Sequence, residues 1–424
     1  MIDYNTKTLQ ANILRGTGKK FASSLFFRFN PFIHKSKILN ILKNIKLTNH
    51  EYQRSESDRH KNDKKLKKHE RTVSQNILTT LSLTKKGYDF LKIKSFHKTD
   101  QYFIDGMNHR NVRGSVGQYL VNRKNDKINI DHHGVFIFYA DCPVLISNYL
   151  NNSLLPNIFH IFNPLSNNIL LKNEKPDNNI SPIGFKDGLS TIKDPTVNAD
   201  ISLVEEHING EIHHGSFLAI RFYWCNPTYI AKLGDTISNT HNISEDFAKG
   251  MLIGRTPNGV PLDKVNPERN ALSMPYNTNF EDFDYNSPSP SKCPHFAHAR
   301  VMNPRNERGI TKNKFNIVRR SLIVSDDANI VMFMSYQNSI KDQLIPLFRR
   351  MGYQSLRNQK DILLYNTREA ETRGVSQFFE AQHPLTNESI SIEREKILTQ
   401  ARGGDFFYTP SLSFFRNMHL LVES

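Results

Sequence analysis

Long apolar runs are missing from this sequence. Its best apolar stretch, Val135 to Ile146, is interrupted by Asp141 and is shorter than the roughly 18 to 20 residues that a membrane span needs. The N-terminal segment contains neither a basic leader nor an apolar stretch, so we expect no secretory signal. The pattern excludes a membrane-spanning helix, and we expect no membrane partner.

Cysteine is also scarce. The 424 residues include three, Cys142, Cys225 and Cys293, and their wide spacing and odd number argue against a disulfide framework. Free thiols are typical of a reducing compartment, so the sequence predicts a cytoplasmic protein. The hydrophobic content of 38% is sufficient for a packed core and excludes wholesale disorder.

Acidic residues are outnumbered by basic ones, which gives a formal net charge of +15. Part of this excess lies in the polar run 53–72, which holds eight Lys or Arg and four Asp or Glu. We interpret this run as a solvated loop or a disordered insertion. The alternative, a nucleic-acid-binding arm, lacks the interleaved aromatic residues that stacking on bases requires, so we do not expect a nucleic-acid partner.

Two segments share a strand–turn–helix pattern. In 24–42 and 216–233 a short apolar stretch ends at an Asn-Pro pair, which begins at Asn30 or Asn226, and apolar residues at helical spacing follow. Asparagine accepts a free backbone N–H at a helix start, and proline suits the first helical position. Each segment therefore predicts a strand, a capping asparagine and a helix.

A second pair of segments has the same order of elements. Segments 135–150 and 330–348 each predict a buried strand, a cap at Asp141 or Asn338, and a helix. The two pairs indicate two α+β domains built on one pattern. A chance likeness between common strand–turn–helix units is the alternative.

The expected domain boundary lies in or near the polar stretch 190–215. We therefore assign residues 1–200 to an N-terminal domain and residues 201–424 to a C-terminal domain. A chain of 424 residues is long enough for two such domains.

Two motifs offer candidate catalytic or metal-binding side chains. In "GFKDG" (184–188), Asp187 stands between two glycines that allow a tight turn, although a solvent-facing aspartate in an ordinary turn is the simpler interpretation. In "CPHFAHAR" (293–300), His298 could bind a metal, with His295 and Cys293 as competing ligands.

Other charged groups leave more than one interpretation open. The run "NIVRRSLIV" places Arg319 and Arg320 in an apolar strand, where one of them would point inward and need an anion. An edge strand with both arginines in water is the alternative. The histidine-rich stretches 131–133 and 205–214 could form a metal site, but no second cluster with standard ligand spacing supports one, and polar loops are the better interpretation.

Taken in order, segments along nearly the whole chain resemble the dye-decolourising peroxidases, a family of haem enzymes. The family commonly has Gln-Gly-Asn-Ile-Leu near its N-terminus, where this chain has Ala11 in place of the glycine. The matching segments are 9–16, 81–93, 184–188, 215–221, 251–262, 293–305, 317–324, 332–343 and 403–414. The polar run 53–72 lies outside the resemblance.

This resemblance implies an α+β fold with two ferredoxin-like domains, antiparallel sheets and haem b (iron protoporphyrin IX) held between them. It implies a peroxidase that uses hydrogen peroxide to oxidise dyes, phenols or other reducing small molecules in one-electron steps. A haem-handling protein with little turnover is the alternative, and a homo-oligomer stays open.

The resemblance also implies roles for individual residues. His298 would be the proximal iron ligand, Asp187 the distal acid–base residue and Arg319 the distal arginine. Arg300 would meet a haem propionate, with Arg305 as a second candidate.

Four more residues complete the expected site. Val331 and Phe333 would line the distal side of the haem. Asp405 is the candidate for the acceptor that bonds to the second nitrogen of His298. Trp224, the single tryptophan, is either an electron relay or a packing residue.

Overall fold

Most of the chain forms one antiparallel sheet with helices around it. The computed structural model describes residues 2–63, 65, 74–94, 97–107, 132–151, 159–162, 171–174, 180–189, 192, 194–268, 283, 285, 293–303, 316–324, 329–352, 361–365 and 374–422. The strands of the main sheet are β1 (Phe21–Phe29), β2 (Leu78–Leu83), β3 (Gly134–Ala140), β4 (Phe159–Phe162), β5 (Leu171–Glu174), β6 (Val204–Ile208), β7 (Glu211–Cys225), β8 (Val318–Arg319), β9 (Leu322–Val324), β10 (Ile330–Gln337) and β13 (Thr399–Thr409).

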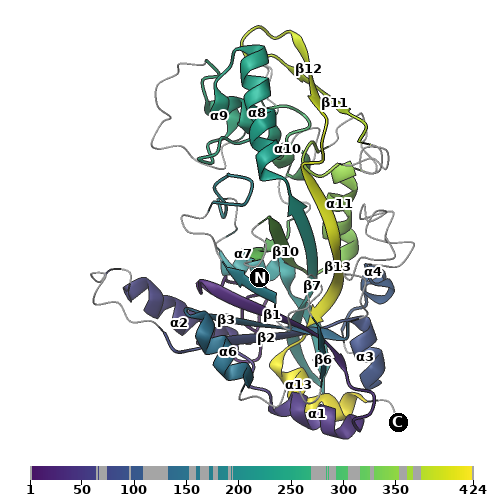
Figure 1. Ribbon diagram of the computed structural model, residues 1–424. Helices are drawn as coiled ribbons and strands as arrows, with labels where there is room; N and C mark the ends of the chain where they lie inside the picture. The colour runs from purple at the N-terminus through teal and green to yellow at the C-terminus, as the bar shows by residue number, and fades with distance from the viewer. Residues whose placement is uncertain are drawn as a thin grey trace.

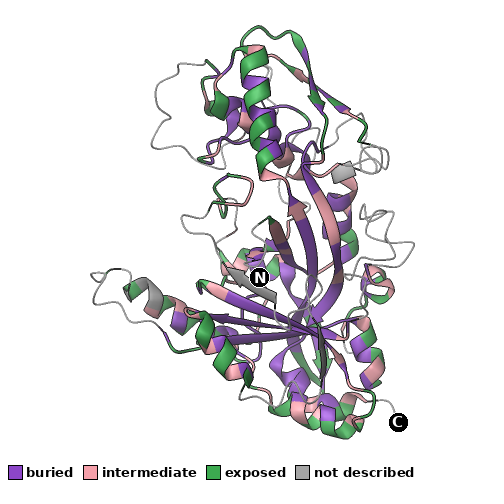
Figure 2. Cartoon of the chain, viewed as in Figure 1, coloured by how far each residue is buried: buried purple, intermediate pink, exposed green. Residues whose placement is uncertain are grey.

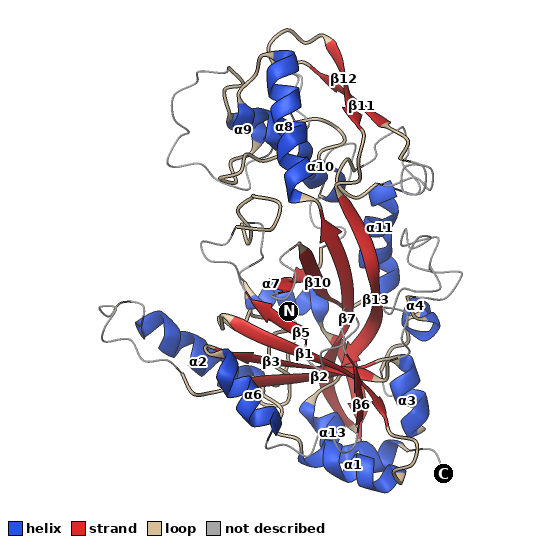
Figure 3. Ribbon diagram, in the orientation of Figure 1, coloured by secondary structure: helices blue, strands red, loops and turns tan. Residues whose placement is uncertain are grey.

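The sheet closes on itself. Its order is β6-β7-β13-β2-β3-β1-β5-β9-β10-β8, β4 pairs with β1, and β10 pairs with β7 as well as with β9. Every strand pair is antiparallel, as the α+β prediction requires. The pairings β13–β2 and β5–β9 join strands from the two halves of the chain into one sheet. Figure 3 shows the strands in red and the helices in blue. The predicted domain boundary at residues 200 and 201 falls within α7 and stays a prediction.

Helices surround the sheet and fill a separate lobe at one end (Figure 1). They are α1 (Lys35–Asn44), α2 (His50–Asp63), α3 (Lys85–Leu91), α4 (Gln101–Asp105), α6 (Pro143–Asn151), α7 (Pro195–Ser202), α8 (Pro227–His241), α9 (Glu245–Ile253), α10 (His298–Met302), α11 (Ile345–Gly352) and α13 (Leu412–Leu421), with the 3-10 helix η4 (Leu262–Lys264) and the π-helix η6 (Ile340–Leu344). A two-stranded sheet of β11 (Gln377–Gln382) and β12 (Ser389–Arg394) belongs to the same lobe as α8, α9 and α10.

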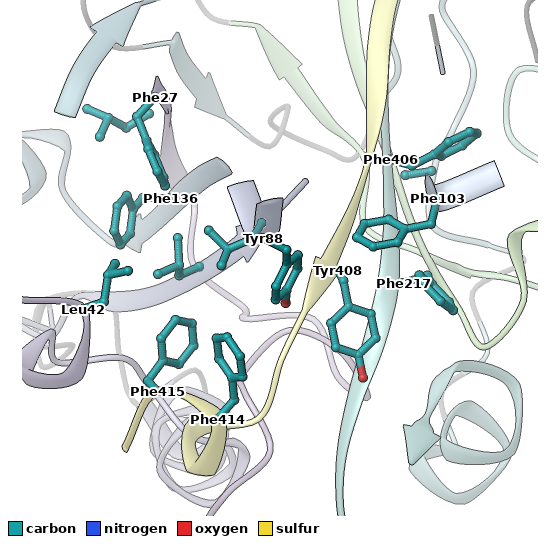
Figure 4. Close-up of a cluster of buried hydrophobic side chains, with 14 of the residues drawn as sticks. Phe27, Leu42, Tyr88, Phe103, Phe136, Phe217, Phe406, Tyr408, Phe414 and Phe415 are labelled. Carbon is teal, nitrogen blue, oxygen red and sulfur yellow. The ribbon is translucent and has the colours of Figure 1, made fainter. Parts of the chain in front are cut away.

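Both faces of the main sheet are buried, which explains its nearly continuous apolar strands (Figure 2). Along β7, Leu218 and Ile220 belong to one hydrophobic cluster, and the alternate residues Phe217 and Ala219 belong to another. The second cluster includes aromatic residues of α3, β13 and α13, drawn in Figure 4. A third cluster lies in the lobe of α8, α9, α10 and the β11–β12 hairpin. The candidate site lies on this third cluster.

One of the four predicted helix caps is confirmed. Asn226 accepts a hydrogen bond from the Tyr229 amide at 3.1 Å, and Pro227 is the first residue of α8. The predicted cap at Asn30 is wrong. Helix α1 starts only at Lys35, and the Asn30 side chain accepts a hydrogen bond from the Phe32 amide in a turn.

The other two predicted caps are wrong, because each helix begins one residue later than predicted, at Pro143 and at Ile340, and each side chain has another partner. Asp141 accepts from the Lys19 ammonium group at 2.9 Å. Asn338 donates to the Asp200 carbonyl oxygen, and the next residue, Ser339, caps the helical segment.

The prediction of a loop or disordered insertion at 53–72 is wrong for its first part. Residues 53–63 belong to helix α2, because the face of this helix that carries Gln53 and Glu56 is buried. Gln53 accepts from the Asn12 amide at 2.7 Å, and Glu56 accepts from Lys19 at 3.2 Å. The highly polar composition hid this inner face.

Candidate functional site

His298 opens the short helix α10 at the edge of the third cluster. The loop before it is held by Cys293, Phe296 and Ala297, all of which are buried, whereas His295 points to solvent. The His298 side chain is 32% exposed. The fold therefore presents one histidine of this loop in a semi-enclosed position and leaves the other in water.

A buried carboxylate orients the His298 ring. Asp361, whose side chain is 0% exposed, places Oδ2 2.7 Å from Nδ1 of His298. Its other oxygen, Oδ1, accepts from the Leu363 amide at 2.9 Å. With Nδ1 donating to the carboxylate, the lone pair of Nε2 is the coordinating one, which is the arrangement common for histidines that bind metals. The donor set fits an axial imidazole ligand.

Asp405, predicted as this acceptor, is elsewhere. Its Oδ1 accepts from the amides of Met107 at 3.2 Å and Phe406 at 2.9 Å, so the prediction is wrong. Asp361 lies 63 residues from His298. No local sequence signal marked it, because only the tertiary fold brings the two side chains together.

The glycine-flanked loop that carries Asp187 is anchored on the same cluster as His298. Gly184 and Gly188 have φ of +83° and +77°, so the predicted tight turn is confirmed. Phe185 is 6% exposed and belongs to the cluster that contains Phe296. The Lys186 amide donates to the Pro257 carbonyl oxygen at 2.9 Å, which fixes the loop further. The Asp187 loop and the loop before His298, which are far apart in sequence, therefore pack on the same hydrophobic cluster.

The Asp187 side chain itself is exposed at the end of this loop. Its Oδ1 accepts from the Gly188 amide at 2.6 Å, an interaction within the turn. The carboxylate is accordingly oriented by its own backbone and is accessible to a small reactant.

Arg319, the last residue of β8, and Arg320, which follows it, have different environments. Arg319 is exposed and pairs in register with Ser335 of β10. Arg320 points inward, where Nε donates to the Asn12 carbonyl oxygen at 2.9 Å and an Nη atom donates to that of Ile13 at 3.1 Å. Burial lowers the pKa of Arg320 to about 10, so this group stays cationic at neutral pH. The expectation that the inward arginine needs an anion is wrong, since carbonyl oxygens accept its hydrogen bonds.

The remaining predicted residues are partly located. Val331 and Phe333 are half-buried on the same face of β10, and the Phe333 ring lies 6.3 Å from that of Tyr223 in an edge-to-face contact. Arg300 is buried, donates to the Cys293 carbonyl oxygen and lies over the Tyr285 ring at 4.9 Å. Their contact with a cofactor stays a prediction.

Some expectations concern other parts of the chain. Arg305 lies outside the described residues, and Trp224 is half-buried on β7. Within the described ranges no group of three or more His, Cys, Asp or Glu side chains could hold a metal ion, so the alternative of a metal site at 205–214 has no support there. No helix in the part that the structure describes combines the length and apolar character needed to cross a bilayer.

The fold resembles solved peroxidase structures over nearly its whole length. The DyP-type peroxidase from Anabaena superposes with a TM-score of 0.78 and 20% identity, covering 97% of this chain and 94% of that one. DyP2 from Amycolatopsis gives 0.77 and 18%, covering 97% and 96%, and the fungal enzyme from Auricularia auricula-judae gives 0.69 and 17%, covering 99% of each. This chain has the DyP-type peroxidase fold. The expected α+β fold with two ferredoxin-like domains is thereby confirmed.

Comparisons of the sequence do not detect this likeness in fold. No protein-family model matches the chain, and no curated protein matches it either. At 15–20% identity the common structure is kept although most side chains differ.

Proposed function

We propose that this protein is a haem peroxidase that reduces hydrogen peroxide and oxidises a small reducing substrate, such as a phenol or a dye. The observation that carries the proposal is the buried Asp361 bonded to Nδ1 of His298 within a DyP-type fold. With Nδ1 bonded to Asp361, His298 would hold the iron of a haem b group through Nε2. Bound haem would supply an iron that accepts peroxide and passes single-electron oxidation to the reducing substrate.

Each polar residue of the candidate site has a task in the proposed reaction. The Asp361 carboxylate holds the Nδ1 proton and makes the His298 ring a stronger donor. The exposed carboxylate of Asp187 takes a proton from hydrogen peroxide and returns it to the oxygen that leaves as water. The Arg319 guanidinium stabilises the negative charge that develops on that oxygen. Arg320 cannot share this task readily, because backbone carbonyl oxygens hold it.

The cofactor assignment is tested with a matched pair of histidine variants. His298→Ala should abolish the absorption band of axially ligated haem, whereas His295→Ala, in the same loop but exposed, should keep the wild-type spectrum. Equal spectra for the two variants would show that His298 is not the ligand.

Catalysis is separated from haem handling by two distal variants. Asp187→Asn and Arg319→Leu should keep the haem spectrum but each lower peroxide-dependent dye oxidation by about 100-fold or more. A haem-handling protein predicts instead that neither variant changes a low basal turnover. If both variants turn over as fast as an active wild type, the assigned acid–base and charge-stabilising roles are wrong.

A further inference from the structure

Backbone hydrogen bonds of the turn at 361–365 fix the orientation of the Asp361 carboxylate. Oδ1 accepts from the Leu363 amide and Oδ2 faces His298, so both oxygens are engaged. The Ile362 amide donates to the Phe296 carbonyl oxygen at 3.1 Å, two residues before His298. A displacement of this turn would therefore move the carboxylate away from the imidazole.

Side chains from outside the turn hold its carbonyl groups. One Nη atom of Arg394 donates to the Ile362 carbonyl oxygen, and the other donates to that of Tyr365 at 2.6 Å. The Thr399 hydroxyl donates to the Leu363 carbonyl oxygen at 2.6 Å. Arg394 spans the turn, because its two Nη atoms bond carbonyls three residues apart.

Arg394 is a buried residue of the β11–β12 hairpin. It is the last residue of β12, its side chain is 1% exposed, and its guanidinium lies 5.2 Å from the centroid of the Phe379 ring on β11. A buried guanidinium is costly unless its hydrogen bonds are satisfied, and its planar fork can bond two acceptors at once, which a lysine ammonium cannot reproduce. The β11–β12 hairpin, which lies apart from the main sheet, thus places a rigid clamp on the turn.

We propose that Arg394 is a positioning residue for the axial ligand: it fixes the 361–365 turn, and through Asp361 it sets the orientation and proton position of His298. The inference rests on the proposed function in one respect, that His298 ligates haem iron. Its structural part, control of the His298–Asp361 bond by Arg394, holds for the protein without cofactor as well. Loss of an outer partner of this kind weakens metal binding by about 10-fold to 100-fold in other proteins.

The test in the haem-loaded protein compares Arg394→Met with Phe379→Leu. The methionine keeps the apolar stem but removes both donors, whereas Phe379→Leu removes the ring under the guanidinium and keeps them. We expect Arg394→Met to weaken haem affinity by about 10-fold and to lower the iron–histidine stretching frequency in the resonance Raman spectrum of the ferrous protein. Phe379→Leu should leave the frequency unchanged, and an equal shift in both variants would overturn the proposal.

A double substitution distinguishes positioning from general loosening. Asp361→Asn should lower the same frequency, and adding Arg394→Met to it should produce no further change, because Arg394 acts through Asp361. An additive further shift would mean that Arg394 acts by another route. Arg394→Lys, which keeps the charge with a single donor point, should fall between wild type and Arg394→Met, and it replaces the methionine variant if that one does not fold.

A cofactor-free measurement separates this inference from the proposed function. Nitrogen-15 NMR of the His298 ring should show one tautomer, protonated at Nδ1, in the wild-type protein, and a mixture of tautomers in Arg394→Met. If wild type binds no haem but this difference is seen, the peroxidase proposal fails and the clamp stands. If both variants show the same ring spectrum, the clamp is wrong whether or not haem binds.

Discussion

Glu206 is a fully buried carboxyl group whose substitution should change how stability depends on pH. It lies on β6 with 0% exposure, and its oxygens accept from the Ser411 amide at 2.9 and 3.2 Å, at the start of α13. A Cβ added at Gly215 would overlap both Oε1 of Glu206 and the Tyr408 hydroxyl, so the carboxyl group is enclosed by backbone and side chains. Burial raises the pKa of Glu206 from 4.5 to about 7, although hydrogen bonds from Ser411 and Tyr408 lower it.

The sign and size of the effect follow from this displacement of the pKa. Because the folded-state pKa of Glu206 is above its ordinary value, the native protein holds this proton more tightly than the unfolded chain does. Its contribution is fully present below pH 4.5 and is lost as the pH rises through 7. A rise from 4.5 to about 7 corresponds to about 3 kcal/mol of unfolding free energy.

The assay is urea unfolding of the cofactor-free protein, followed by far-UV circular dichroism at several pH values from 5 to 8. Glu206→Gln keeps the shape and an acceptor oxygen but cannot ionise, so from pH 5 to pH 8 it should gain about 2.5 kcal/mol of stability relative to wild type. Glu205→Gln, an exposed carboxyl on the same strand, controls for the loss of one negative charge. A stability difference between Glu206→Gln and wild type that does not vary with pH would refute the reasoning.

Three further substitutions or modifications test the core. Lys19→Met should destabilise the protein by about 3 kcal/mol in urea unfolding, because it leaves the buried Glu56 carboxylate, 3.2 Å from the Lys19 ammonium group, without this cation. Gly404→Ala should cost about 3 kcal/mol in thermal unfolding, since φ is +153° and the new Cβ would overlap backbone atoms of β7. A thiol reagent should label Cys142 first in the native protein, because Cys142 is half-buried whereas burial raises the pKa of Cys225 to about 12.

Each of these three predictions has a matched control. Lys20→Met removes an exposed ammonium group beside Lys19, and Gly16→Ala adds a Cβ that meets no atom within 4 Å. Both should change stability by less than about 0.5 kcal/mol. For the thiols, urea should release two additional reactive groups, and rapid labelling of all three in the native protein would contradict the burial of Cys225 and Cys293.

Local sequence signals were sufficient where one segment makes its own interactions. The Asn226 cap and the Gly184–Gly188 turn each depend on hydrogen bonds or backbone angles within a few residues, and both were predicted correctly. The prediction of Asn338 as a helix cap was wrong by one position. Ser339 caps the helical segment instead, and the Asn338 side chain bonds to a residue 138 positions away. Composition misled for α2, since few buried positions are enough to order an otherwise polar helix.

The candidate site divides in the same way. Its motif residues, His298, Asp187 and Arg319, could be named from short patterns and a resemblance. The partner of His298 could not, because Asp361 and Asp405 look alike as isolated aspartates and differ only in what lies beside them. The hydrogen-bond partners of Arg320 likewise could not be predicted, because they depend on where the N-terminal segment places its carbonyl groups.

The sequence by itself determined the α+β class, the resemblance to dye-decolourising peroxidases and the candidate residues of the proposed site. These properties depend on periodicity and on short motifs, which neighbouring residues encode. Only the tertiary structure decided that the sheet closes on itself, that Asp361 faces His298 and that Arg394 bonds to the turn that carries Asp361. Those features are contacts between residues tens of positions apart. Such contacts form, and stabilise the protein, only when the whole chain is folded.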